Sequence, residues 1–234
     1  KEFGVYNGTG IEESIFQLEK NAVLKSDIRI GVSKSLIDYW QKNFDYRINF
    51  HEIIPSCTSF SLIPKNFNIN ENNYVTIVFS GSSAKWQSFE LMCKHFDCFL
   101  SLNNNLRIKI LSKNTSAFSE LIKKYPDKIQ LMWVNHDKVK DILLSADYGY
   151  VYREQTETNK VASPVKIAEY LSCGLKLLIS NSLGDYSNLT LLNNLGYNLD
   201  SNDFNFSNIQ KVDKVEKVRI SKFAMENFYL ESEK

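Results

Sequence analysis

Residues 148–180 read YGYVYREQTETNKVASPVKIAEYLSCGLKLLIS. This stretch predicts a buried strand at 148–152, a polar loop, a helix and a second apolar strand, in that order. Ser163 is a favourable N-cap residue, and Pro164 suits the first helical position because its missing N–H would be unpaired there. Gly174 is typical of a helix end. We therefore expect a strand, helix and strand unit whose helix opens at Ser163.

The charges in the first turns of this helix indicate a binding site. The helix dipole disfavours a cation such as Lys166 near the N-terminus, so an anion is expected beside it. Unpaired N–H groups and a nearby Lys form a ready phosphate site. Glu169 lies on roughly the same face, and a carboxylate there can accept hydrogen bonds from the hydroxyl pair of a ribose. The alternative is a solvated pair of opposite charges, and the local pattern leaves both open.

The composition excludes several classes of function. The chain has 234 residues, 43% of them hydrophobic, which suits one large domain or one and a half. Lys and Arg number 28 and Asp and Glu 27, so no global basic field indicates nucleic acid or an anionic membrane surface. No apolar run approaches the roughly 18 to 20 residues of a membrane span. We expect a cytoplasmic protein that binds no nucleic acid.

Cysteine and histidine give no sign of metal chemistry. The four cysteines form no CxxC pair, and the three histidines occur singly, without an HExxH motif. We expect plain thiols, no metal and no nucleophilic triad.

The order of elements predicts the fold class. Residues 1–63 read as a βαβαβ unit, and the Asn-rich segment 64–73 is the expected linker. Strands then alternate with helices, which implies a parallel sheet covered on both faces. The expected strands are 74–79, 107–111, 129–134, 148–152 and the one ending at 180, and the expected helices are 87–102, 116–125, 138–145 and 163–174. We predict an α/β, doubly wound, Rossmann-like domain at 74–211 and a terminal helix within 212–234.

Ligands bind such sheets beyond the carboxyl ends of the strands, so the loops there hold the candidate residues. The Gly/Ser-rich loop 80–85 lets a backbone approach an anion at Gly81, with Lys85 as the counter-charge. It lacks GxGxxG, and a simple tight turn with a surface Lys stays open as the alternative. A base would be held largely by backbone groups that follow the strand at 129–134, at Trp133, Val134 and Asn135.

The segments GSSAKWQ at 81–87 and VASPVKIAEYLSCG at 161–174 resemble the donor-binding half of the GT-B glycosyltransferases of family four. The resemblance covers most of the chain, and the Pro, Lys, Glu-Tyr-Leu and Gly of the second segment stand at the family's spacings. It implies that Glu169 binds the donor ribose and that Lys85 neutralises the donor diphosphate. Ser82 stands where many relatives have an Arg, so diphosphate binding would also involve Gly81, Arg153, Ser163 and Lys166.

One residue departs from the family pattern. Val161 lies eight residues before Glu169, where the family's E-x7-E element has a Glu that contacts the transferred sugar. Glu154 or Asn159, in the same loop, is expected to bind the donor sugar instead.

The N-terminal region fits the same family. Residues 7–13, NGTGIEE, resemble a degenerate HGxxPEE segment of the acceptor-side domain. The chain begins at Lys1, so we expect residues 1–63 to be the remnant of a larger acceptor-side domain, onto which the terminal helix packs. We further expect a truncated chain of this kind to bind donor and transfer little sugar.

The resemblance implies a function in bacterial surface polysaccharide or capsule biosynthesis. The co-substrate would be a UDP- or GDP-type sugar, with no other cofactor and no metal, and the sugar would pass to a glycan or lipid-linked acceptor with retention. Peripheral attachment to the inner face of the plasma membrane through the missing half would be compatible with it. Two alternatives stay open: a nucleotide-sugar 2-epimerase on the same fold, and a non-catalytic nucleotide-binding module.

Overall fold

The computed structural model describes residues 10–47, 50–63, 67, 73–81, 87–113 and 116–229. The strand expected at the start of the chain, most of the expected linker at 64–73, and Ser82 and Lys85 lie outside these ranges.

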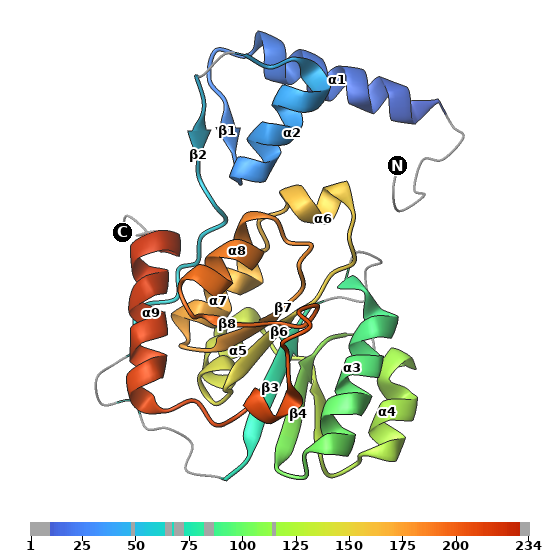
Figure 1. The fold of residues 1–234 in the computed structure, drawn as a ribbon, viewed down its shortest axis with the longest axis vertical. Coiled ribbons are helices and arrows are strands. Elements are labelled where there is room, and N and C mark those ends of the chain that lie inside the picture. The colour runs from blue at the N-terminus through green and yellow to red at the C-terminus, as the bar shows by residue number, and fades with distance from the viewer. Residues whose placement is uncertain are drawn as a thin grey trace.

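A six-stranded parallel sheet forms the main body, in the order β5-β4-β3-β6-β7-β8 (Figure 1). The strands are β3 Val75–Ser80, β4 Leu106–Leu111, β5 Ile129–Met132, β6 Tyr148–Val151, β7 Lys176–Ile179 and β8 Gly196–Asn198. In the longest pairing, Val75 on β3 aligns with Leu106 on β4 and Ser80 with Leu111. This arrangement confirms the predicted α/β class and the doubly wound parallel sheet.

Two apolar clusters cover the two faces of the sheet. On one face α3 Phe89–Leu102 and α4 Ser119–Lys124 pack on residues such as Ile77 and Tyr150. On the other face α5 His136–Leu144, α7 Val165–Ser172 and α9 Lys214–Phe228 pack on Val78 and Val151 (Figure 1). Central parallel strands are buried on both sides, which explains why β3 and β6 read as nearly continuous apolar runs.

Several elements differ from the sequence prediction. Helix α7 begins at Val165, one residue later than a Ser163 cap requires, and its N-cap residue is Pro164. Two further helices, α6 Glu157–Val161 and α8 Asp185–Leu192, and the short edge strand β8 were not predicted. The Thr156 hydroxyl caps α6 by accepting a hydrogen bond from the Asn159 N–H, at 3.1 Å.

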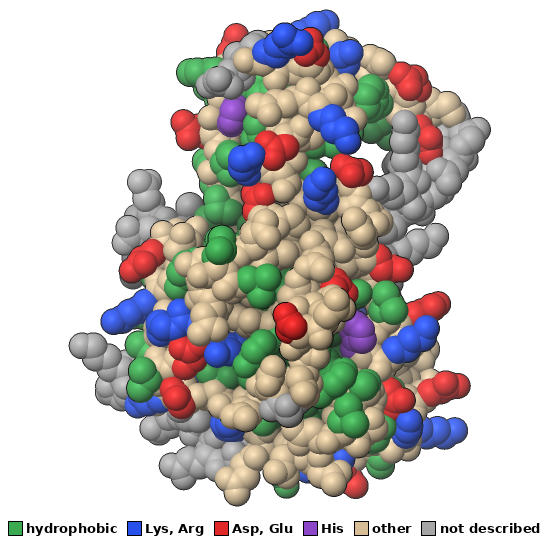
Figure 2. All heavy atoms as spheres, in the orientation of Figure 1, with side chains coloured by type: hydrophobic (Ala, Val, Ile, Leu, Met, Phe, Trp, Pro, Cys, Tyr) green, Lys and Arg blue, Asp and Glu red, His purple; other side chains and the backbone are tan. Residues whose placement is uncertain are grey.

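The N-terminal unit carries α1 Ile11–Lys25, β1 Ile30–Gly31, α2 Lys34–Phe44 and β2 Glu52–Ile53, with β1 and β2 parallel. Its own apolar cluster includes Ile37, Trp40 and Phe44. Figure 2 shows this unit as a separate lobe, and acidic and basic side chains are interspersed over the face drawn. Helix α9 contacts the segment that leads out of the unit, because the Thr58 N–H donates to the Phe228 carbonyl at 2.8 Å.

Within the described ranges, none of the helices combines the length and apolar character that crossing a bilayer requires.

Candidate functional site

The sheet has one switch point, between β3 and β6. The chain turns from β3 towards β4 and β5, and from β6 towards β7 and β8, so the loops after β3 and β6 diverge. A crevice at this point is where open α/β sheets bind ligands. Gly81 follows β3, Arg153 follows β6, and the first turn of α7 adds Lys166.

Lys166 is a buried cation at the switch point, with only 8% of its surface exposed. Its Nζ atom donates to the Gln87 side-chain oxygen at 3.0 Å and lies 4.6 Å from the centre of the Phe79 ring. Burial, and then repulsion from Arg153, lower the pKa of Lys166 to about 7, while the Glu169 carboxylate opposes this shift. Lys166 is therefore close to losing its charge at neutral pH.

Arg153 is the second buried cation, also 8% exposed. One guanidinium nitrogen donates to the Asn159 side-chain oxygen at 3.5 Å, while Nε has no hydrogen-bond partner among the described residues. Burial lowers the pKa of Arg153 to about 10. The Asn159 amide is held in turn by the Glu154 carbonyl, to which it donates at 2.9 Å.

Acidic groups compensate the two cations only in part, since the Glu169 carboxylate favours the charged form of Lys166 without pairing with it. Among the described residues, neither Lys166 nor Arg153 forms an ion pair within 4.0 Å. A buried charge without a counter-charge costs several kcal/mol after relaxation. An anion placed beside them would offset that cost.

A pocket of about 510 Å³ lies at the carboxyl ends of β3, β4 and β5. The predicted residues Gly81, Trp133, Val134 and Asn135 all line it. Trp133 is 59% exposed, and the Lys113 Nζ atom lies 4.6 Å from the centre of its ring. A large exposed aromatic side chain beside a cavity provides a surface on which a flat ring can stack.

Glu169 lies next to this pocket, because it contacts the lining residue His136. The Glu169 side chain is 13% exposed, and its Oε1 atom lies 3.5 Å from the His136 Nε2 atom. His136 is the first residue of α5 and lines the pocket. The carboxylate therefore interacts with Lys166 on one side and with a residue that lines the pocket on the other.

The sequence matches no protein-family model, and the comparison with curated proteins returns no match. Solved structures do match. The structure of WaaG, a glycosyltransferase involved in lipopolysaccharide biosynthesis, is similar at 14% sequence identity and a TM-score of 0.56. The match covers 84% of this chain and 57% of that one.

Two further structures extend this result. Sucrose-phosphate synthase from Thermosynechococcus elongatus matches at 12% identity and a TM-score of 0.66, over 97% of this chain and 62% of that chain. The pneumococcal O-GlcNAc transferase GtfA, in complex with UDP and GlcNAc, matches at 16% identity and a TM-score of 0.57. The match covers 92% of this chain and 41% of that chain. The main body is a Rossmann-like domain of the GT-B kind. The chain spans about half the length of these three structures.

In this GT-B-like domain, the Ser163 hydroxyl has hydrogen-bond partners other than the backbone of α7. Its hydroxyl oxygen accepts from the Ser56 N–H at 2.8 Å and shares a short hydrogen bond with the Tyr186 hydroxyl. Ser163 therefore joins the segment after the N-terminal unit to α8, and the prediction that it caps α7 is wrong, because the helix begins two residues later.

Two other predicted residues contribute differently from the expectation. The Gly81 N–H donates to the Leu111 carbonyl at 3.0 Å, so Gly81 provides space rather than a free donor. Glu154 is exposed, and its backbone N–H donates to the Ser88 hydroxyl at 2.8 Å. Both stay close to the switch point.

Sequence reasoning missed three residues of the site: Gln87, His136 and Tyr170. The Tyr170 hydroxyl accepts from the Ser80 N–H at 2.8 Å and so fixes the end of β3. Its ring lies against Gly149, where a Cβ atom would stand 2.1 Å from a ring carbon. The sequence signal for this contact was Gly149, a glycine within the apolar strand that precedes the EYL motif.

The N-terminal unit is fixed to the GT-B-like domain by a carboxylate. Asp185 accepts hydrogen bonds from the N–H groups of Lys34 and Ser35, the first two residues of α2, at 2.6 and 3.1 Å. The Ser33 hydroxyl donates to the Val161 carbonyl at 2.8 Å. The loop after β7 thus caps a helix of the other unit.

Proposed function

We propose that this chain binds a nucleoside diphosphate sugar at the switch point and supplies the donor side of a glycosyltransferase. Arg153 and Lys166 hold the diphosphate, Glu169 accepts from the ribose hydroxyls, and the base stacks in the pocket beside Trp133. The sugar passes to a hydroxyl of a glycan or lipid-linked acceptor. The fold supports this proposal, because the matched structures include glycosyltransferases and one holds UDP.

The observation that carries the proposal is the pair of buried cations without an acidic partner. A structural lysine or arginine that is nine-tenths buried normally has a carboxylate or several carbonyl partners. Arg153 instead keeps a buried Nε atom without a partner among the described residues. A diphosphate supplies both the charge and the acceptor oxygens that this site lacks.

The chemistry follows from the same charges. Transfer breaks the bond between the anomeric carbon and the diphosphate oxygen, which leaves negative charge on that oxygen. Preorganised cations in a site screened from water stabilise such charge as it develops. The acceptor oxygen forms the new bond, and its proton passes to the leaving diphosphate. No metal is invoked, and we propose that the product retains the donor's configuration.

Donor and acceptor would meet between the two units. The proposed pathway is the assembly of a surface polysaccharide, supported by the likeness to a structure that is involved in lipopolysaccharide biosynthesis.

Calorimetric titration with UDP, GDP and ADP tests the donor site. We expect one of the three to bind, and we expect the Arg153→Gln and Lys166→Met variants each to weaken that affinity. Lys160→Met is the matched control, because Lys160 is exposed on α6. The absence of binding by all three nucleotides at millimolar concentration would reject the proposal.

A further inference from the structure

Two amide side chains hold the cations of the switch point. The Gln87 side-chain oxygen accepts from the Lys166 Nζ atom at 3.0 Å, and the Asn159 side-chain oxygen accepts from the Arg153 guanidinium at 3.5 Å. Both amides are buried, Gln87 with 8% of its surface exposed and Asn159 with 0%. Within the described ranges, each cation thus has a neutral amide as its side-chain hydrogen-bond partner.

The backbone of Glu154 joins the two amides. Its carbonyl accepts from the Asn159 amide at 2.9 Å, and its N–H donates at 2.8 Å to the hydroxyl of Ser88, the residue after Gln87. The loop after β6 and the segment before α3 are therefore tied together beside the cations. Side chains supported in this way keep their geometry before a ligand arrives.

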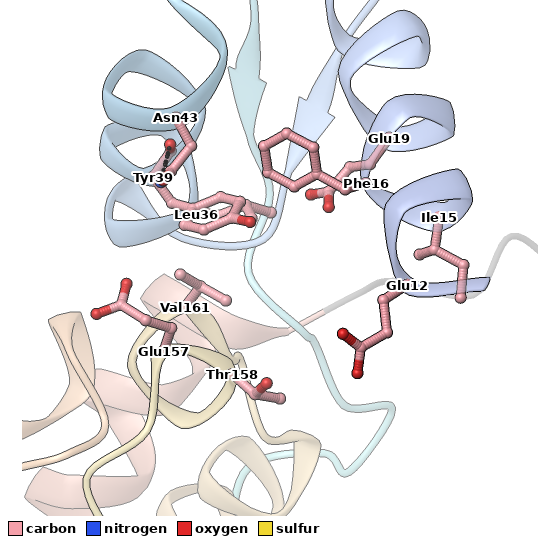
Figure 3. Close-up of a pocket in the computed structure, with 10 residues that line it drawn as sticks. All are labelled: Glu12, Ile15, Phe16, Glu19, Leu36, Tyr39, Asn43, Glu157, Thr158 and Val161. Atoms are coloured by element: carbon pink, nitrogen blue, oxygen red, sulfur yellow. Dashed lines mark hydrogen bonds between the residues drawn. The ribbon is translucent and has the colours of Figure 1, made fainter. Parts of the chain in front are cut away.

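Helix α6 turns Asn159 into the GT-B-like domain. Three other residues of this helix, Glu157, Thr158 and Val161, line a second cavity, which α1 and α2 face from the N-terminal unit (Figure 3). Asn159 is the one buried residue of α6. Its side chain therefore serves the cation side of the helix and not that cavity.

A neutral acceptor differs from a carboxylate in a way that matters at an anion site. Both orient an ammonium or guanidinium group through a hydrogen bond, but a carboxylate also cancels the charge of that group. Glu and Asp have the shapes of Gln and Asn, so ion pairs would fit in the same space. With amides at both positions, the charges of Lys166 and Arg153 stay available to a ligand.

We propose that Gln87 and Asn159 are positioning residues of the diphosphate site. Each orients one buried cation and leaves the charge of that cation to the ligand. Asn159, one of the two residues expected at the donor sugar, acts on the ligand through Arg153 in this arrangement. The proposal rests on the proposed function, in which the diphosphate is the ligand of both cations.

Variants with acids of the same shape test this proposal. Gln87→Glu and Asn159→Asp each add a carboxylate beside one cation. We expect each variant to bind UDP or GDP about tenfold more weakly in calorimetric titrations at pH 7. Gln130→Glu on β5 and Asn227→Asp on α9 are the matched controls, because both residues are exposed, and we expect both to keep the wild-type affinity.

Neutral variants separate the effect of charge from the effect of a lost hydrogen bond. Gln87→Met and Asn159→Leu remove the acceptor oxygen and add no charge. We expect each to weaken nucleotide binding less than the acid at the same position does. Thermal melting of every variant is measured beside the titrations, so that a loss of folded protein is recognised.

Removal of each cation separates a positioning role from a purely structural one. In the Lys166→Met background, Gln87→Glu should cause a smaller loss of affinity than in the wild type, because the cation it neutralises is gone. Asn159→Asp should behave in the same way in the Arg153→Gln background. A structural defect would lower the affinity equally in both backgrounds.

The pH dependence of binding provides a further readout. Burial and Arg153 lower the pKa of Lys166 to about 7, and Glu169 opposes this shift. A carboxylate at position 87 would raise that pKa. We therefore expect the nucleotide affinity of Gln87→Glu to change little between pH 7 and 9, a range in which the wild type loses affinity as Lys166 loses its proton.

Inorganic pyrophosphate, which has neither base nor ribose, is the second probe. Pyrophosphate binding that the acid variants weaken, without binding of any nucleoside diphosphate, would reject the donor site and support the positioning role. Binding that an acid variant leaves unchanged, or lowers equally without its cation, would overturn the role of that residue and leave the donor site in place. A wild-type chain that binds neither probe would overturn both proposals.

Discussion

The Nζ atom of Lys166 lies 2.8 Å from the point where a Cβ atom would stand on Gly81. The absence of a side chain after β3 therefore provides the space that the ammonium group occupies. Because the Gly81 N–H is already bonded to the Leu111 carbonyl, this space is its contribution to the site. The loop after β3 and the first turn of α7 are thereby fitted to each other.

Enlarging residue 81 should displace the lysine and weaken nucleotide binding. Gly81→Val places two methyl groups beside the ammonium, whereas Gly81→Ala adds one carbon against the flexible end of a side chain. We expect a loss of about 10 to 100-fold in UDP or GDP affinity for Val and a smaller loss for Ala. Calorimetry measures the loss, and equal affinity of both variants and the wild type would contradict the fit between these loops.

Nucleotide affinity should fall as the pH rises above 7. The pKa of Lys166 is about 7, and a bound diphosphate would raise it, so binding above pH 7 takes up a proton. We expect a decrease approaching tenfold per pH unit between pH 7 and 9, a range in which the nucleotide phosphates, with a second pKa of about 6, are already ionised. Lys166→Met should remove the slope, and Lys160→Met should keep it.

The ribose role of Glu169 predicts a specific loss of discrimination. Glu169→Ala should weaken UDP or GDP binding by about 1 to 3 kcal/mol, the cost of losing a charged hydrogen-bond acceptor. The variant should also bind the 2′-deoxy nucleotide as well as the ribonucleotide. Glu154→Ala is the control, since its proposed partner is the sugar, which these nucleotides lack. Undiminished preference for the ribonucleotide would remove Glu169 from this role.

Gly149 should tolerate no side chain. A Cβ atom there would stand 2.1 Å from the Tyr170 ring, and both residues are buried in the sheet and α7. We expect Gly149→Ala to lower the free energy of unfolding by about 1 to 3 kcal/mol through overpacking. Thermal and urea unfolding measure this loss. Adding Tyr170→Leu should recover part of it, and additive losses in the double variant would contradict the contact.

Lys217 predicts a pH dependence of stability. It is 2% exposed on α9, donates to the Ala146 carbonyl, and has a pKa lowered by burial to about 8. The unfolded chain binds the proton up to about pH 10.5, so stability is greatest above that pH and falls as the pH drops towards 8. Each pH unit is worth about 1.4 kcal/mol.

Urea unfolding between pH 7 and 10 measures this slope. Lys217→Met should reduce the slope of the unfolding free energy against pH. Lys222→Met, a substitution of an exposed residue on the same helix, should leave that slope unchanged. A slope that is equal in both variants would show that Lys217 is solvated.

The central strands could be predicted from sequence, because each is a short apolar run between polar loops. The edge strand β8 is only three residues long, and α8, with the sequence DYSNLTLL, has no clear apolar stripe. Strand β8 is held by its pairing with β7, and α8 packs on β8, which sequence periodicity does not report. Helix α6 has five residues, four of them polar, and a Thr156 cap, a pattern that also fits a loop.

The cations of the site could be predicted for a related reason. Lys166 opposes the helix dipole, and Arg153 follows a buried strand, so each shows its role locally. Gln87 and His136 have no such signal, because their importance lies in partners 79 and 33 residues away, Lys166 and Glu169. The attachment of the N-terminal unit involves Asp185, whose capping of α2 is a tertiary contact.

Asp185 is the first residue of α8, and its carboxylate accepts hydrogen bonds from the first two N–H groups of α2. Any rotation of one unit against the other must break those two hydrogen bonds. The hydrogen-exchange rates of the Lys34 and Ser35 amide protons consequently report how often this contact between the two units opens. Their exchange with deuterium would time that motion without a label or a substitution.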